Sequence, residues 1–311
     1  MTPSWQAVKG LAINVIDCHS FQGRTRARQK YLKPCLLSWG MASAALGKSR
    51  AKPETGKLMR RRHVVAAIIA ALALLGAEPR ARAQSLADGN PHDGVAAAHT
   101  MPVQGIDVSY WQGDIDWDKV RMAGVAFAYI KATEGGDVVD PKFLQNWNGA
   151  KNAGIVRGAY HFIYWCRPAD EQALWFMLNV PDDPDALPPV LDLEWNSASK
   201  TCPDHVSREV ALAKIKIMLD AMQAHTGKQP IIYTDPVFYR DVLDGEFTNY
   251  HYWLRSVAAA PEAKYYRRTW AFWQFTTTGK VPGVAGRVDR NSFNGTQADW
   301  QRVLQWLEAS R

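Results

Sequence analysis

Cysteine is scarce in this chain, which has four Cys among its 311 residues. Only Cys166 and Cys202 lie in the part that we expect to fold. Two Cys residues without matching His partners make a poor zinc site, and no adjacent His orients either thiol as a nucleophile. Long apolar runs are also missing, because the run at residues 64–77 covers about 14 residues and is short for a membrane span. The cysteines therefore do not support zinc or thiol chemistry.

Acidic residues are scarce only in the first third of the chain. Residues 1–100 hold 15 Lys and Arg against 5 Asp and Glu, a net charge of +10, whereas residues 101–311 hold 22 against 25, a net charge of −3. The overall charge of +7 thus belongs to the first 100 residues. Because a nucleic-acid-binding domain presents a basic face, the sequence predicts that nucleic acid is not a partner.

The first 100 residues read as three segments ahead of a folded domain. Residues 1–58 show no sustained apolar periodicity, and we interpret them as an upstream extension of the reading frame, with translation starting at Met59. Residues 59–83 combine a basic start, a short apolar run and Ala81-x-Ala83, which is typical of a signal peptide; an uncleaved signal anchor is the alternative. Residues 84–100 predict a flexible linker. We expect an exported monomer, periplasmic or extracellular, with no stable membrane span after processing.

Residues 101–311 alternate strand-like and helix-like segments. Strands are predicted at 105–111, 127–133, 156–165, 187–195, 230–234, 250–256, 270–276 and 287–293. Helices are predicted at 116–123, 140–153, 168–178, 207–225 and 297–309. Repeated βα units imply a parallel sheet, and eight strands favour a closed α/β barrel of irregular, TIM-like type. Functional side chains should then gather at the carboxyl ends of the strands.

Two carboxylates lie two residues apart in the apolar run Leu187-Pro-Pro-Val-Leu-Asp-Leu-Glu-Trp195. In a β-strand, residues i and i+2 face the same side, so Asp192 and Glu194 project together, with Cα atoms about 6 to 7 Å apart. Two such carboxylates cannot ionise independently, and the less solvated one has a raised pKa and can act as a general acid. The pair indicates glycosidase chemistry, and the alternative is a surface strand with two solvated acids.

Further polar residues lie on other predicted strands: Asp107 on the first, Glu134 on the second, His161 on the third and Asp289 on the last. Buried acids are costly unless they are paired or functional, so their convergence is a stronger signal than any one of them. Aromatic residues accompany them, and aromatic faces beside carboxylates suit sugar rings. A histidine such as His161 is more often a satisfied core residue than a catalyst.

The two cysteines of the domain follow neighbouring predicted strands. Cys166 comes after the third strand and Cys202 after the fourth, so both lie just past carboxyl ends. In an oxidising compartment we expect a disulfide that ties two loops at the rim of the site. Two free thiols are the alternative.

Five motifs in order resemble the glycoside hydrolase family 25 lysozymes, muramidases related to the Chalaropsis type. They are Gly105-Ile-Asp-Val-Ser-Tyr-Trp-Gln-Gly, Phe127-Ala-Tyr-Ile-Lys-Ala-Thr-Glu-Gly, Gly158-Ala-Tyr-His-Phe, Leu191-Asp-Leu-Glu and Trp273-Gln-Phe. The resemblance covers about residues 103–294. It implies a (β/α)5β3 barrel that cleaves the β-1,4 bond between N-acetylmuramic acid and N-acetylglucosamine in peptidoglycan glycan strands, with no metal or cofactor.

The resemblance also implies a set of site residues. Its catalytic positions map onto Asp107, Asp192, Glu194 and Asp289, with Glu194 similar to the proton donor. Asp192 would stabilise positive charge on the sugar, as a nucleophile or by holding the substrate's acetamido group, and the spacing leaves both open. The predicted substrate-binding residues are Tyr110, Glu134, Tyr160, Phe162, Trp195, Tyr233 and Trp273.

Two other functions stay open at this stage. A catalytically silent glycan-binding barrel would be favoured if one of the acids were missing, and all are present. A metal-dependent polysaccharide deacetylase would use Asp107, His161 and Asp192 as ligands, and sensitivity to a chelator would distinguish it from a two-carboxylate enzyme. No wall-binding repeat follows the barrel motifs, so the means of targeting the substrate stays open.

Overall fold

The structure is a computed structural model that describes residues 95–310. The predicted upstream extension, the predicted signal peptide and residues 84–94 of the predicted linker lie outside the described residues. Within residues 95–310, no helix has both the length and the apolar character needed to cross a membrane.

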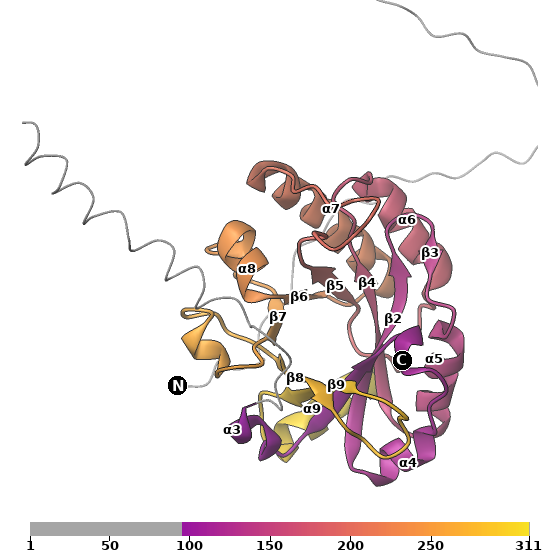
Figure 1. Ribbon diagram of the computed structural model, residues 1–311. Coiled ribbons are helices and arrows are strands. Elements are labelled where there is room, and N and C mark those ends of the chain that lie inside the picture. Colours follow the sequence, from indigo (N-terminus) through magenta and orange to yellow (C-terminus); the bar gives the residue numbers. More distant parts are fainter. Residues whose placement is uncertain (1–94, 311) are drawn as a thin grey trace, which may run out of the picture. The chain divides into compact units, whose positions relative to one another are not determined.

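Eight strands of the described part close into a barrel (Figure 1). Each strand pairs with the next, and β1 pairs with both β2 and the last strand, which completes the ring. The barrel strands are β1 (Gln104–Val108), β2 (Val125–Glu134), β4 (Val156–Phe162), β5 (Val190–Leu193), β6 (Ile231–Thr234), β7 (His251–Arg255), β8 (Phe272–Gly279) and β9 (Val288–Phe293). The two-residue β3 (Val138–Val139) extends the sheet beside the end of β2.

Seven of these strands run parallel, and β9 runs antiparallel to both of its neighbours, β8 and β1. The amino end of β9 therefore lies at the same end of the barrel as the carboxyl ends of the other strands. Residues near the start of β9 can thus share a site with residues near the ends of the parallel strands.

Helices follow the first five barrel strands and cover the outside of the barrel (Figure 1). They are α4 (Trp117–Met122), α5 (Phe143–Asn152), α6 (Ala169–Asn179), α7 (Arg208–Thr226) and the short α8 (Pro236–Phe238), which continues into the π-helical η2 (Tyr239–Leu243). The strands β7, β8 and β9 have no such helices between them. The predicted barrel of five βα units and three further strands is confirmed.

The ends of the longest helix follow directly from its sequence. The Ser207 side chain accepts a hydrogen bond from the Val210 amide and caps the start of α7. Gly227 ends it in the left-handed conformation, with φ of 67°, which glycine adopts without steric cost. The helix predicted at 207–225 is thus confirmed, within one residue at each end.

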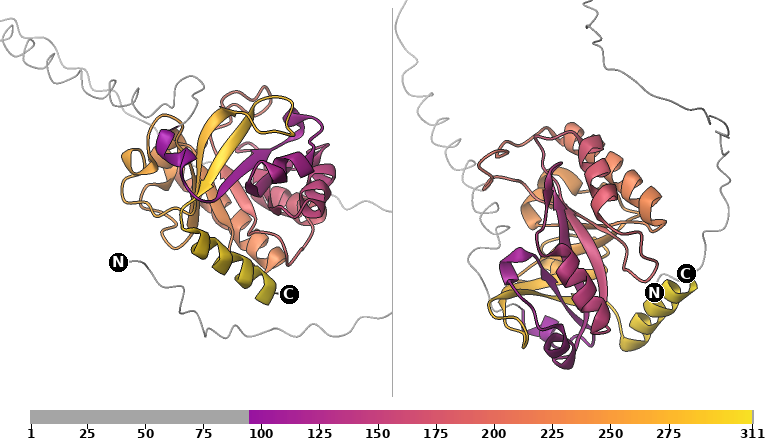
Figure 2. Two further views of the ribbon diagram at one scale, coloured as in Figure 1. Left: turned by 90° about the horizontal axis from the view of Figure 1, so that it is seen from below. Right: turned by 90° about the vertical axis from the view of Figure 1, so that its right-hand side faces the viewer.

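Side chains alternate between two apolar layers along the barrel strands, as the period of two requires. One layer fills the barrel interior, and the other lies between the strands and the outer helices. The interior layer includes Phe127, Tyr129, Val190, Ile231, Trp253 and Phe272. Helix α9 (Gln297–Ala309) closes one end of this interior with Trp300 and Leu307, and Figure 2 shows it in yellow beside the barrel. The carboxyl end of the parallel strands is left for a site.

Two local differences from the predicted elements bear on the site. The first strand ends at Val108 rather than at residue 111, because residues Tyr110–Gln112 form a 3-10 turn, η1, capped by Ser109. Residues Ala96–His99, at the end of the predicted linker, form the short helix α3. Ala98 of α3 is buried against Trp273 and Phe275 of β8, so this part of the segment is packed on the barrel.

Candidate active site

A pocket of about 110 Å³ lies at the carboxyl end of the parallel strands. Its lining is almost entirely polar, in contrast to the apolar interior below it. The lining residues are Asp107, Tyr160, Asp192, Glu194, Tyr233, Trp253, Gln274 and Asp289. The structure therefore brings together the four carboxylates that the sequence and the resemblance single out.

Each carboxylate owes its position to the strand that carries it. Asp107 lies one residue before the end of β1, and Asp192 one residue before the end of β5. Glu194 directly follows β5, so it leaves the strand two residues after Asp192 on the same side. Asp289 is the second residue of the reversed strand β9, where it pairs in register with Asp107. The ends of two parallel strands and the start of one antiparallel strand thus meet in one pocket.

Two amide side chains hold one pair of these acids. Gln274 Nε2 donates to Asp107 Oδ2 at 3.0 Å and to Asp289 Oδ2 at 3.1 Å. Asn291 Nδ2 also donates to Asp107 Oδ2, at 2.8 Å, and its Oδ1 accepts from Trp253 Nε1 at 2.8 Å. Asp107 and Asp289 are therefore fixed by neutral donors that are themselves buried or fixed by a strand.

The other pair, Asp192 and Glu194, has a different environment. Asp192 Oδ1 is buried and accepts no hydrogen bond from any residue between positions 95 and 310. The hydroxyl of Tyr233 donates to Gln274 Oε1 at 2.9 Å and also lies close enough to Glu194 to lower its pKa. The backbone of Glu194 is fixed, because its carbonyl oxygen accepts from Trp165 Nε1 at 2.6 Å. One oxygen of the Asp192 carboxylate is thus buried without a hydrogen-bond donor among residues 95–310.

Burial raises the pKa of both members of this pair. Burial raises the pKa of Glu194 to about 7, helped by the negative charge of Asp235 and opposed by Arg255. Burial also raises the pKa of Asp192 well above its usual range, and the charge of Glu194 adds to the shift. The nearby charge of Lys131 opposes it. Near neutral pH the pair can therefore hold a proton that an exposed carboxylate would lose.

The hydrogen-bonded pair is shifted by the same causes. Burial raises the pKa of Asp107 to about 6, although the hydrogen bonds from Asn291 and Gln274 lower it. Burial and the charge of Asp107 raise the pKa of Asp289 to about 8. Such a concentration of perturbed carboxyl groups in one cleft is typical of an active site.

Two lining residues, Gln274 and Trp253, and the neighbouring Asn291 were not predicted as site residues from the sequence or the resemblance. Gln274 connects three groups of the site, Asn291 supports Asp107, and Trp253 supports Asn291. The signal was present for Asn291, which lies two residues after Asp289 in a strand and so faces the same side. Gln274 lies inside the Trp273-Gln-Phe motif, in which substrate binding was predicted for the aromatic residue Trp273 and not for Gln274.

The predicted substrate-binding aromatics divide into two groups. Tyr160 and Tyr233 line the pocket. Trp273 does not, because it faces out of the barrel, packs with Ala98 and donates from Nε1 to the Ser256 carbonyl oxygen at 2.7 Å. The prediction that Trp273 lines the groove is therefore wrong: neighbouring strand residues face opposite sides, and here Gln274 takes the inward position.

Trp195 also lies outside the pocket lining. Its ring stacks on His205 at a centroid distance of 4.0 Å, and its Nε1 donates to Asp241 Oδ2 at 3.0 Å. It packs edge-on against Trp165 and Phe238. Trp195 therefore supports the loops that follow β5 and β6 and does not line the pocket.

Tyr110, Phe162 and Glu134 lie at strand ends near the pocket without lining it. Tyr110 is 41% exposed, with its ring 4.5 Å from that of Trp111, which is 76% exposed. Phe162 pairs in register with Asp192 on the neighbouring strand. Both carboxylate oxygens of Glu134 are occupied, one by Lys131 and one by the Tyr164 hydroxyl.

His161 is a core residue. Its side chain is fully buried on the helix side of β4, with Nδ1 2.8 Å from Thr133 Oγ1 and Nε2 3.3 Å from Gln172 Oε1. It cannot join Asp107 and Asp192 as the deacetylase alternative requires, since those two face the interior. Between residues 95 and 310, no three His, Cys, Asp or Glu side chains are grouped as a metal site.

The predicted disulfide is present between Cys166 and Cys202, with Cα atoms 5.5 Å apart. It joins the loop after β4 to the loop after β5, which leaves the strand at Glu194. Between these loops, Asn196 donates from Nδ2 to the Ile163 carbonyl oxygen and accepts at Oδ1 from the Trp165 amide. The rim beside Asp192 and Glu194 is thus crosslinked by one covalent bond and by several hydrogen bonds.

Comparison with known proteins gives consistent matches. Residues 106–284 match the family described as glycosyl hydrolases family 25. The chain is 39% identical over 226 residues to lysozyme M1 of Streptomyces globisporus, covering 69% of this chain and 76% of that protein. It is 34% identical over 147 residues to the N,O-diacetylmuramidase of a Chalaropsis species, covering 44% of this chain and 68% of that protein. The solved bacterial lysozyme from Streptomyces coelicolor matches with a TM-score of 0.60 and 38% identity, covering 68% of this chain and 100% of that one.

Proposed function

Because the chain belongs to glycosyl hydrolases family 25 and is therefore a glycoside hydrolase, we propose that it is an exported muramidase that acts on peptidoglycan. The bond cleaved would be the β-1,4 linkage between N-acetylmuramic acid and N-acetylglucosamine. Similar proteins that carry the names lysozyme and N,O-diacetylmuramidase support this substrate. The observation that carries the proposal is the buried pair Asp192 and Glu194 in a polar pocket at the barrel end.

Glu194 would act as the general acid. Its pKa of about 7 lets a large fraction of the group hold its proton near neutral pH, where an exposed Glu would be ionised. In the reaction this proton passes to the glycosidic oxygen as the bond to the sugar breaks, so the leaving sugar departs as a neutral alcohol. The nearby Tyr233 hydroxyl and the charge of Arg255 would then stabilise the Glu194 carboxylate that remains.

Asp192 would stabilise the positive charge that develops on the sugar ring. It would do so as a nucleophile or by hydrogen bonding the acetamido group of the substrate as that group attacks. Asp192 lines the pocket, from which its carboxylate would make either contact, and its Oδ1 accepts no hydrogen bond from the residues at 95–310. Asp107 and Asp289 would shape the electrostatic field and hydrogen-bond the sugar or the neighbouring acids, from positions fixed by Gln274 and Asn291.

Export is supported by two features of the chain. The basic start, short apolar run and Ala81-x-Ala83 at residues 59–83 have the pattern of a signal peptide. The disulfide between Cys166 and Cys202 fits an oxidising compartment. The pocket is formed by one chain, and we propose that the enzyme works as a monomer.

The test is a muropeptide analysis of peptidoglycan digested by the purified full chain. The wild type should release new reducing-end muramic acid, and this release should survive a chelator. Glu194→Gln should lower the rate by about 10²- to 10⁴-fold, the usual contribution of a general acid. Glu308→Gln, on the exposed face of α9, serves as the matched control and should retain full activity.

The pH profile tests the role of Glu194 separately. Because the acid must be protonated, wild-type activity should fall as the pH rises through about 7. Retained binding to the glycan without any cleavage would instead identify a catalytically silent barrel. Loss of activity in chelator would revive the metal-dependent alternative.

A further inference from the structure

Lys131 is an unusual residue for the interior of a barrel. On β2 the preceding inward residues, Phe127 and Tyr129, belong to the apolar interior layer, and Lys131 is the next residue with that orientation. Its side chain is only 16% exposed. An ammonium group that is largely shielded from water inside a barrel requires a negatively charged partner. Its position next to a pocket with four carboxylates calls for an explanation.

An irregularity in the strand supplies the first partner. The register between β2 and β4 shifts between Lys131 and Thr133, which is the mark of a β-bulge. Without a bulge, residues i and i+3 of a strand would face opposite sides, but here Glu134 turns toward Lys131 and forms an ion pair with it. Thr133 faces the other way and contacts His161. The bulge thus points both charged groups of β2 to the pocket side.

Glu134 is held in turn by Tyr164. The Tyr164 hydroxyl donates to Glu134 Oε1, while Lys131 Nζ donates to Oε2. Both carboxylate oxygens are therefore occupied by protein groups, so Glu134 is poorly suited to the sugar contact predicted from the sequence. Its role is better described as holding Lys131.

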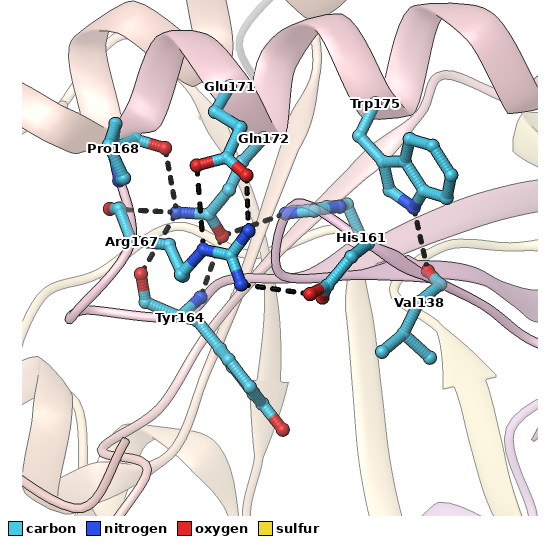
Figure 3. A network of polar contacts seen from close by, with 9 residues as sticks. Val138, His161, Tyr164, Arg167, Pro168, Glu171, Gln172 and Trp175 are labelled. Carbon is cyan, nitrogen blue, oxygen red and sulfur yellow. Dashed lines mark hydrogen bonds and ion pairs between the residues drawn. The ribbon is translucent and has the colours of Figure 1, made fainter. Parts of the chain in front are cut away.

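The main chain of Tyr164 is clamped by the side-chain amide of Gln172 on α6. Gln172 Oε1 accepts from the Tyr164 amide at 2.8 Å, and Gln172 Nε2 donates to the Tyr164 carbonyl oxygen at 2.9 Å. Arg167, three residues further, forms ion pairs with Asp137 and Glu171. Figure 3 shows the Tyr164 ring pointing away from this cluster of polar contacts. A rigid base on α6 therefore orients the hydroxyl that holds Glu134.

The other end of this chain of contacts reaches the catalytic pair. The Lys131 ammonium lies 5.2 Å from the centre of the Phe162 ring, and Phe162 pairs in register with Asp192. The charge of Lys131 lowers the pKa of Asp192, while Arg255 acts in the same sense on Glu194. A different cation thus favours the ionised form of each carboxylate: Lys131 for Asp192 and Arg255 for Glu194.

We propose that Tyr164, Glu134 and Lys131 form a positioning relay that holds the Lys131 ammonium on the pocket side of β2, two strands from Asp192, and so favours ionisation of Asp192 in catalysis. The inference rests on the proposed function of the pair. It makes Lys131 a positioning residue that acts through Asp192, and it assigns Glu134 and Tyr164 to the support of Lys131.

Several charged groups act on the pKa of Asp192, and a test must distinguish the effect of Lys131 from theirs. Asp192 is influenced by Glu194, Asp107 and Asp235, which raise its pKa, and by Lys131, which lowers it. Lys131 forms an ion pair with Glu134, and its charge also lowers the pKa of Asp140 and of His161. Neutralising Lys131 should therefore make the first negative charge on the pair harder to form.

The experiment compares pH profiles of kcat on peptidoglycan for the full chain and its variants. Lys131→Met should move the acidic limb to higher pH by about one pH unit, the scale of an opposite charge at close range. At a pH on that limb, kcat should fall about tenfold, with KM nearly unchanged. Lys131→Arg should keep the limb near its wild-type position, because it keeps the charge. Lys151 lies on the outer helix α5 and forms an ion pair with Asp183. Lys151→Met is the matched control and should leave the pH profile unchanged.

Tyr164→Phe provides a second arm that keeps the cation in place. Releasing one oxygen of Glu134 should move the acidic limb in the same direction by a smaller amount. This variant also tests the relay if Lys131→Met does not fold. An acidic limb that stays at the wild-type pH in Lys131→Met or, failing that, in Tyr164→Phe would overturn the relay. Muramidase activity of the wild type and its loss in Glu194→Gln are independent of this shift, so failure of the relay and failure of the proposed function are distinguishable.

Discussion

The pocket holds two pairs of carboxylates with opposite kinds of support. Asp107 and Asp289 accept three hydrogen bonds from the side-chain amides of Gln274 and Asn291. Asp192 keeps one oxygen without a donor in the described part of the chain, and its pair is influenced by the charges of Lys131 and Arg255. Fixed neutral dipoles hold a carboxylate in place, whereas a pair left open can contact a ligand and exchange a proton. The two pairs thus differ in how the protein holds them, and the proposed function gives them different roles.

Among the tests of this comparison, the largest effect on kcat is expected when one acid of each pair is replaced by its amide. Asp192→Asn should lower kcat by about 10²- to 10³-fold, because it removes the charge that faces the sugar. Asp289→Asn should lower kcat by about tenfold, since it changes a charge that acts from a distance. Initial rates of reducing-end release give both numbers, and circular dichroism checks that both variants fold. Equal losses in the two variants would remove the distinction between the pairs.

Gln274→Ala attacks the support of the first pair without changing any charge. It leaves Asp107, Asp289 and Tyr233 each without one hydrogen-bond partner. The free energy of unfolding should fall by about 1 to 3 kcal/mol, the cost of leaving a buried polar group unsatisfied. Denaturant titration measures it. Gln145→Ala, at an exposed position on α5, is the control and should change stability by less than about 0.5 kcal/mol.

The raised pKa values predict how stability depends on pH. Carboxyl groups in an unfolded chain titrate near pH 4, whereas Asp107 and Asp289 titrate at about 6 and about 8 in the folded protein. Between these values the folded state binds more protons than the unfolded state, so stability falls as the pH rises. The melting temperature should be higher at pH 5 than at pH 8. Asp289→Asn should lose part of this difference, and an undiminished difference would contradict the assignment.

The smallest effect on catalysis is expected at Trp273. The residue packs on α3 outside the barrel, so Trp273→Phe should lower the melting temperature by removing the bond to Ser256 while leaving KM unchanged. Tyr233→Phe, at a residue that lines the pocket, should change the kinetics instead. A raised KM in Trp273→Phe would return this residue to the substrate groove.

The sequence was sufficient to predict the barrel and the meeting of the acids, because both follow from strand order and from the period of two. Asp192 and Glu194 share a side for that reason, the first family motif located Asp107, and Asp289 followed from the predicted last strand and the resemblance. The same period was not used for Trp273 and Gln274, since a short motif does not show which of two neighbouring residues faces inward. The bulge after Lys131 was also out of reach, because a bulge depends on pairing with β4 and leaves no local mark. Contacts between distant strands, such as Asn291 with Asp107, need the fold itself.

The closure of the barrel by β9 has a consequence for folding. β1 pairs with β9 across most of the domain, and Asp107 receives a hydrogen bond from Asn291, 184 residues later in the chain. Contacts so distant in sequence carry a large loop-closure entropy and form late. During synthesis, a nascent chain that has not yet reached β9 lacks Asp289, Asn291 and the last wall of the pocket. Assembly of the candidate site is therefore coupled to completion of the barrel.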